Sequence, residues 1–153
     1  MLRVSETTKA IDVRLRQFIY RHFIQKEKAP RIREMAPALK CNPREIHAGL
    51  GRLSQSHAIM VEESGELWRA APFSAVPTAF PVEIGPRRYW ANCIWDALGI
   101  PAMLRHDGVI RSSCGCCNLA MTVKVEKGKV AGAKGTIHFA VPARHWYQDI
   151  VFT

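Results

Sequence analysis

The 153-residue sequence has no apolar run of the about 18 or more residues that a membrane-spanning helix needs. Its first residues, MLRVSETTKAID, contain no apolar core, so we expect no secretory signal peptide. These two absences predict a cytoplasmic protein without a membrane partner. A hydrophobic fraction of 48% is ordinary for a globular chain and is sufficient for a core.

The cysteines are few and poorly spaced for a disulfide framework. The chain has five, an odd number, and two of them are adjacent: Cys41, Cys93, Cys114, Cys116 and Cys117. Without a signal peptide, we expect reduced thiols of a cytosolic protein. Their purpose would then be metal, redox or nucleophilic chemistry.

A concentrated basic tail is also missing, although the net charge is +9. Lys and Arg exceed Asp and Glu by 13 to 8 in residues 1–70 and by 9 to 5 in residues 71–153. Charge spread in this way permits contact with nucleic acid but does not require it.

Residues 1–70 predict a winged-helix-like module of three helices and a β-hairpin. An amphipathic helix starts near Ile11 and ends before Pro30, and a short helix follows. Asn42-Pro43-Arg44-Glu45 is a strong start for the third helix, since Asn42 can cap it and Glu45 can reach back to the cap. Two short strands then surround a Ser64-Gly65 turn.

Two roles stay open for this module. As a DNA reader, its third helix would expose four polar side chains: Arg44, His47, Arg52 and Gln55. The predicted wing instead carries three acidic residues, Glu62, Glu63 and Glu66, which oppose contact with phosphate. DNA is therefore a candidate partner, and a structural or dimerising role is the favoured one. We interpret His22 and His57 as core or boundary residues.

Residues 71–86 contain four prolines, at positions 72, 77, 81 and 86. Proline forbids a regular helix and disfavours a central strand, so we expect an extended linker. Its apolar side chains predict that the linker packs against both modules.

Residues 87–153 predict an α+β domain, a small antiparallel or mixed sheet beside one main helix. The helix is expected within Arg87–Leu104, where Gly99 and Pro101 break the pattern. Strands are expected over 109–113, 120–125, from Val130 and over 135–141, and another element starts at His145.

Cys93 and Asp96 lie three residues apart in the predicted helix, so they should share one face. A thiolate beside a proton-carrying carboxylate is a working chemical pair if it faces a pocket. The alternative is a cysteine buried as a small hydrophobic residue.

The Cys114-Gly115-Cys116-Cys117-Asn118 turn has three interpretations. It could be half of a zinc site, which only His106, His138 or His145 could complete, so we do not expect structural zinc. It could be a redox pair. It could also place one thiol near Cys93.

The second half resembles the organomercurial (alkylmercury) lyase family. The resemblance is carried by YWANCIWDAL at 89–98, by Ile100-Pro101-Ala102 and by Ser112-Ser113-Cys114, and it covers roughly residues 80–153. It implies cleavage of a carbon–mercury bond in a small organomercury substrate, with Hg(II) as the product ion. Cys93 would be the mercury-binding thiolate and Asp96 the proton donor. No cofactor would be required, and cellular thiols would accept the product.

The family also has a second mercury-binding cysteine, and its nearest equivalent here is Tyr147. Cys116 or Cys117, or a residue beyond Thr153, would have to supply this metal ligand, because the resemblance implies a longer chain. An apolar wall of Trp90, Ile94 and Trp95 would suit the organic group and could raise the pKa of the aspartate.

Two non-enzymatic functions stay open. One is a DNA-binding regulator that senses a soft metal or a thiol oxidant. The other is an inactive family member that only binds Hg(II).

Overall fold

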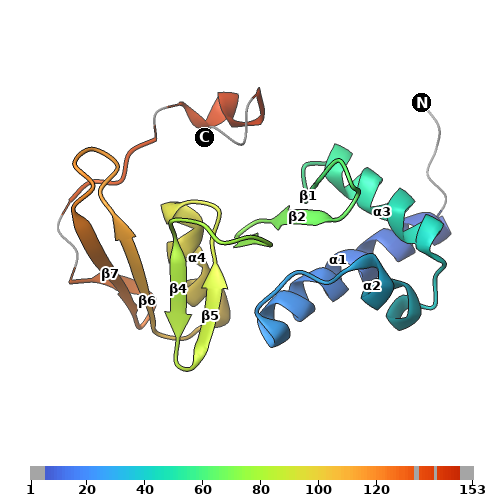
Figure 1. Cartoon of the computed structure of the whole chain (residues 1–153), viewed down its shortest axis with the longest axis horizontal. Coiled ribbons are helices and arrows are strands. Elements are labelled where there is room, and N and C mark those ends of the chain that lie inside the picture. The colour runs from blue at the N-terminus through green and yellow to red at the C-terminus, as the bar shows by residue number, and fades with distance from the viewer. Residues whose placement is uncertain (1–5, 133–134, 140, 149–153) are drawn as a thin grey trace.

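The computed structural model describes residues 6–132, 135–139 and 141–148 (Figure 1). The helices are α1 (Glu6–Lys26), α2 (Ile32–Leu39), α3 (Pro43–Gln55), α4 (Ile94–Leu104) and the 3₁₀ helix η1 (Ala143–Gln148). The strands are β1 (Met60–Val61), β2 (Leu67–Ala70), β3 (Phe73–Ser74), β4 (Pro81–Ile84), β5 (Arg87–Trp90), β6 (Gly108–Ser113), β7 (Ala120–Glu126) and β8 (Lys129–Ala131). The α+β prediction is confirmed.

The first half has the three predicted helices, followed by the antiparallel sheet β1-β2-β3. The predicted start of α3 is present as a capping box. The Asn42 side-chain oxygen accepts the N–H of Glu45 at 2.9 Å, and the Glu45 carboxylate accepts the N–H of Asn42 at 2.8 Å. These bonds satisfy two of the donors that a helix start leaves without partners, so α3 begins at Pro43.

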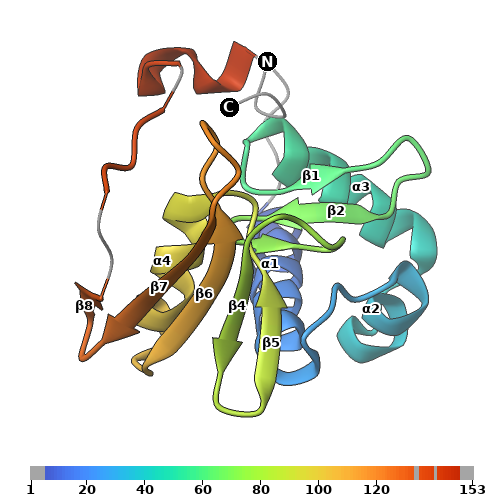
Figure 2. The same ribbon diagram turned by 60° about the vertical axis from the view of Figure 1, so that its left-hand side comes forward.

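The second half is built on an antiparallel sheet with the order β5-β4-β6-β7-β8. Ile110 of β6 lies opposite Val82 of β4 and Val123 of β7, and all three side chains are buried. Helix α4 packs against β4, β6 and β7 (Figure 2). Apolar side chains on one face of β4, β6 and β7 therefore form the core beneath α4.

The proline-rich segment 71–86 is not a strand-free linker. It contributes β3 to the first sheet, and β4 lies between β5 and β6 in the second. The expectation that its prolines disfavour a central strand is not met, because β4 is one. Pro81 is the first residue of β4, and the pairing with β6 starts at Val82, so no ladder bond depends on a proline N–H.

The predicted helix over 87–104 is shorter at its start and longer past Pro101 than expected. Residues Arg87–Trp90 form β5, and α4 runs without interruption from Ile94 to Leu104. Pro101 is buried against Gly108, where an added Cβ would lie 2.6 Å from the proline Cγ. This close packing offsets the backbone hydrogen bond that proline cannot make.

The C-terminal prediction is only partly met. Described residues 135–139 and 141 form no strand, whereas 143–148 form η1. Residues 149–153 lie outside the described residues, as do Ala140 and the side chain of Tyr147.

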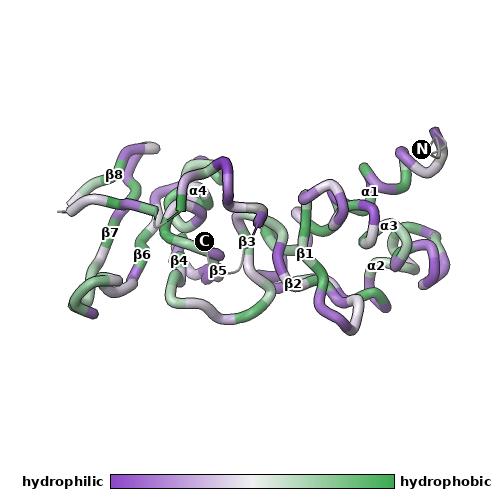
Figure 3. Tube along the Cα trace, turned by 90° about the horizontal axis from the view of Figure 1, so that it is seen from above, coloured by the Kyte–Doolittle hydropathy of each residue, from purple (hydrophilic) through white to green (hydrophobic). Residues whose placement is uncertain are grey.

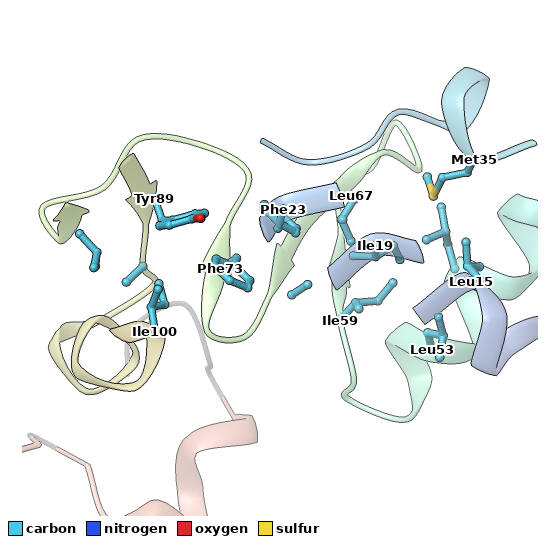
Figure 4. Close-up of a cluster of buried hydrophobic side chains, with 14 of the residues drawn as sticks. Leu15, Ile19, Phe23, Met35, Leu53, Ile59, Leu67, Phe73, Tyr89 and Ile100 are labelled. Carbon is cyan, nitrogen blue, oxygen red and sulfur yellow. The ribbon is translucent and has the colours of Figure 1, made fainter. Parts of the chain in front are cut away.

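The two halves share one core (Figure 4). Phe23 of α1 stacks on Phe73 of β3 with ring centroids 5.1 Å apart, and Phe73 lies 5.6 Å from the Tyr89 ring of β5. The Tyr89 hydroxyl donates to the Ile24 carbonyl at 3.0 Å. These contacts hold the first half against the second, and the candidate site lies between them.

Among the described residues, we find no helix that combines the length and the hydropathy of a membrane span. Figure 3 shows hydrophilic residues interrupting the hydrophobic ones along the helices of both halves.

Candidate active site

A cavity of about 340 Å³ lies where the two halves meet. Its walls come from the end of α3 through β1, from β2, from the start of α4 and from the C-terminal segment. The residues that line it are Ser54, His57, Ala58, Ile59, Met60, Arg69, Ala71, Asn92, Cys93, Trp95, Asp96, Phe139 and Trp146. Both residues of the predicted chemical pair are among them.

Cys93 is the N-cap of α4 rather than a residue within it. Its backbone is extended (φ −148°, ψ 178°), and its sulfur accepts the N–H of Asp96 at 3.5 Å. We expected Cys93 and Asp96 to share one face within a helix. That expectation is corrected, because α4 starts at Ile94 and Cys93 lies just before it. The two side chains still act on each other, since both line the cavity and the negative charge of Asp96 helps to raise the pKa of Cys93.

Asp96 is held by the residue one turn before it. The Asn92 side-chain amide donates to Asp96 Oδ2 at 3.1 Å. Burial raises the pKa of Asp96, and the hydrogen bonds from Asn92 and Cys93 and the positive charge of Arg69 offset only part of that effect. This carboxylate therefore takes up a proton more readily than an exposed aspartate.

Burial also raises the pKa of Cys93, and the negative charge of Asp96 adds to the effect. The N–H groups of Asp96 and Trp95 at the helix start oppose it without reversing it. Between the pKa of Asp96 and the pKa of Cys93, the pair therefore holds one proton, and the thiol carries it.

Aromatic side chains form one wall of the cavity, but only one of the three predicted wall residues is among them. Trp95 lines the cavity and packs edge-on against Phe139 at 6.5 Å, and Phe139 contacts Trp146 at 5.0 Å. Trp90 lies on β5 under the Arg88 guanidinium, and Ile94 packs against the core. Neither residue lines the cavity. Trp90 belongs to β5, which ends before α4 begins, and the Ile94 side chain packs against the hydrophobic core.

The sequence interpretation missed His57, Met60 and Arg69 as cavity residues. They come from the first half, which the resemblance does not cover. His57 has a positive φ of 58° directly after α3. No spacing rule connects this segment to Cys93, since only the packing of the two halves brings them together.

The cavity-lining residues do not include Cys116 or Cys117. Both are exposed on the turn that joins β6 to β7. The prediction that one of them joins Cys93 as a mercury ligand therefore lacks support, since a tight hairpin turn holds them on the surface. Within the described residues, no group of three or more His, Cys, Asp or Glu side chains is arranged to hold a metal ion.

Two of the side chains proposed to read DNA, Arg52 and His47, make contacts within the protein instead. Arg52 makes two bonds to the Asp12 carboxylate, at 2.8 Å and 2.6 Å. His47 lies against the wing, since a Cβ at Gly65 would come within 2.9 Å of its ring. The Arg52 guanidinium would have to give up these two bonds to contact a DNA phosphate, which argues against a DNA-reading role.

A family model described as alkylmercury lyase matches residues 73–153, more than half of the chain. The chain belongs to the alkylmercury lyase family. Among solved structures, the mercury-bound form of MerB2 is similar, with a TM-score of 0.63 and 22% sequence identity. The similarity covers 85% of this chain and 61% of that one, so the chain spans less than two thirds of its solved relative. No curated protein matches the chain.

Proposed function

We propose that this alkylmercury lyase family member cleaves the carbon–mercury bond of small organomercury compounds by protonolysis. The observation that carries the proposal is that Cys93 and Asp96, joined by the bond from the Asp96 N–H to the Cys93 sulfur, lie together in a cavity with an aromatic wall. Thiolate is a soft ligand and suits mercury, a soft metal. A buried carboxylate that takes up a proton readily suits a general acid.

In the first step, the Cys93 sulfur bonds to mercury in R–Hg–SR′, where SR′ is a cellular thiolate. The Cys93 proton moves to the Asp96 carboxylate, because a metal displaces the proton of a thiol ligand. Mercury then carries the organic group and two sulfurs. In this scheme the second thiolate arrives with the substrate, so no second protein cysteine is needed.

In the second step, the electron pair of the mercury–carbon bond takes the proton from Asp96. RH leaves, Asp96 returns to carboxylate, and mercury remains as Cys93–S–Hg–SR′. A second cellular thiol then donates its proton to Cys93 and removes Hg(SR′)₂. The scheme needs no resident cofactor, and its partners are the organomercury substrate and cellular thiols, as expected for a cytoplasmic enzyme.

The aromatic wall has a place in this scheme. Trp95, Phe139 and Trp146 would contact the alkyl or aryl group and keep water from the carboxylate. The first-half module, which we delimit as residues 1–70, would act by closing the cavity with Met60 and Arg69 rather than by binding DNA.

Release of benzene from phenylmercury tests the proposal. Purified protein is incubated with phenylmercury and an excess of a monothiol, and benzene is measured by gas chromatography. We expect repeated turnover above the rate with thiol alone. A folded protein that releases no benzene above that background would exclude the lyase activity.

The pH dependence is a second prediction. The active pair carries one proton, so kcat/KM should fall below the pKa of Asp96, where both groups are protonated, and above the pKa of Cys93, where neither is. Because both pKa values are raised, both limbs should lie at higher pH than for an exposed aspartate and cysteine.

Asn92→Ala sharpens this prediction, because it removes a hydrogen bond that stabilises the Asp96 carboxylate. The pKa of Asp96 should rise further, and the acid limb of the kcat/KM profile should move to higher pH. An acid limb identical to that of the wild type would rule out Asp96 as its source.

A further inference from the structure

Three thiols lie within four residues on the β6–β7 turn, and the proposed reaction does not use them. Cys116 and Cys117 are exposed, and Cys114 is half-buried. Unpaired cysteine is among the most buried residue types, because it packs as a small hydrophobic residue. Packing therefore does not account for this cluster.

The turn brings two of these sulfurs together. The Cys114 carbonyl accepts the N–H of Asn118, and the Cys114 N–H donates to the Leu119 carbonyl, each at 2.8 Å. The chain between them makes one tight turn, so Cys114 and Cys117 lie on the same side of it. The N–H groups of Cys117 and Cys116 and the Cys117 thiol lie close enough to the Cys114 sulfur to lower its pKa.

This arrangement suits an ion that needs only two ligands. Zinc usually takes four protein ligands, and the described residues hold no group of three or more metal-binding side chains. A soft ion that binds two thiolates in a linear geometry does not need four protein ligands. We propose that Cys114 and Cys117 form a surface site that binds inorganic Hg(II) through two sulfurs, separate from the Cys93 cavity.

Binding is a ligand exchange without oxidation or reduction. Hg(II) arrives as Hg(SR′)₂, two mercury–sulfur bonds form to Cys114 and Cys117, and the two protein protons leave on the two displaced R′S groups. Two thiols on one short turn act as a chelate, which should raise the affinity over two separate thiols by about 10²-fold or more. The exposed turn lets the bulky thiolate complex reach the site.

A mercury titration of the Cys93→Ser protein tests this inference without depending on the lyase reaction. Reduced protein is titrated with Hg(II) in a small excess of a monothiol, and bound mercury is counted by native mass spectrometry. We expect one tightly bound Hg(II) per chain. The variant that also carries Cys114→Ser and Cys117→Ser should bind it at least about 10²-fold more weakly, because the chelate is lost.

The matched control adds Cys41→Ser to the Cys93→Ser protein. Cys41 is a half-buried cysteine of the first half whose thiol donates to the Leu39 carbonyl at 3.5 Å. This control should keep the bound mercury, and circular dichroism should show that all variants are folded. Equal mercury binding with and without Cys114 and Cys117 would overturn the site, as would no binding in the Cys93→Ser protein.

Discussion

Cys93→Ser is expected to reduce benzene release from phenylmercury by at least ~10³-fold, the order of loss seen when a nucleophile is removed from residues that act as a unit. A serine hydroxyl is a hard, weakly acidic ligand and does not displace a thiolate from mercury. Serine is close in size to cysteine and is itself a good helix N-cap, so α4 should still start at Ile94. The measurement is the initial rate at saturating phenylmercury.

Cys41→Ser is the matched control for this substitution. Cys41 is also half-buried, but it does not line the cavity, so its replacement should leave the rate unchanged. If Cys93→Ser kept wild-type turnover, another ligand would have to capture mercury, and the proposed reaction would be wrong.

Asp96→Asn is expected to lower kcat by about 10²- to 10⁴-fold, the usual contribution of a positioned general acid. Asparagine has nearly the same shape, but it neither accepts the Cys93 proton nor gives it to carbon. Mercury capture by Cys93 should survive, with the thiol proton passing to the buffer instead, so the organomercury group should accumulate on the protein. A rapid single-turnover experiment separates these two steps.

Asp107→Asn is the carboxylate control. Asp107 is exposed, accepts the Lys127 N–H at 2.7 Å and does not line the cavity. Its replacement should keep wild-type kcat. A loss in Asp107→Asn as large as that in Asp96→Asn would show that the assay reports folding rather than proton transfer.

Local patterns predicted much of the fold. The capping residues before α3, the Ser64-Gly65 turn and the alternation of β7 act over a few neighbouring residues, and each element is present. The same holds for Cys93 and Asp96, whose flanking residues resembled one family strongly enough to assign a chemistry. In these places the local preference and the final packing agree.

Long-range packing decided the rest. Arg87–Trp90 became a strand because β4 offers it a partner, and Pro101 stays within α4 because Gly108 leaves room for its ring. His57, Met60 and Arg69 reach the cavity because contacts such as Phe23–Phe73 join the two halves. Such contacts join residues far apart in sequence, so neither spacing nor composition could predict them.

The position of the second mercury-binding thiol could not be predicted from the sequence either. The sequence has no cysteine after Cys117, so Cys116 or Cys117 was the candidate, but their turn holds both on the surface. The proposed reaction therefore takes its second sulfur from the substrate's own thiolate. This makes the activity depend on a thiol in solution, which the excess of monothiol in the benzene assay provides.

Alkylation of the Asp96→Asn protein after exposure to phenylmercury tests the central claim most directly. Trypsin should release Tyr89–Arg105, a peptide in which Cys93 is the single cysteine. The reaction proposed here predicts that phenylmercury protects Cys93 from the alkylating reagent while no benzene forms. Full alkylation of Cys93, with phenylmercury bound to other cysteines, would contradict it.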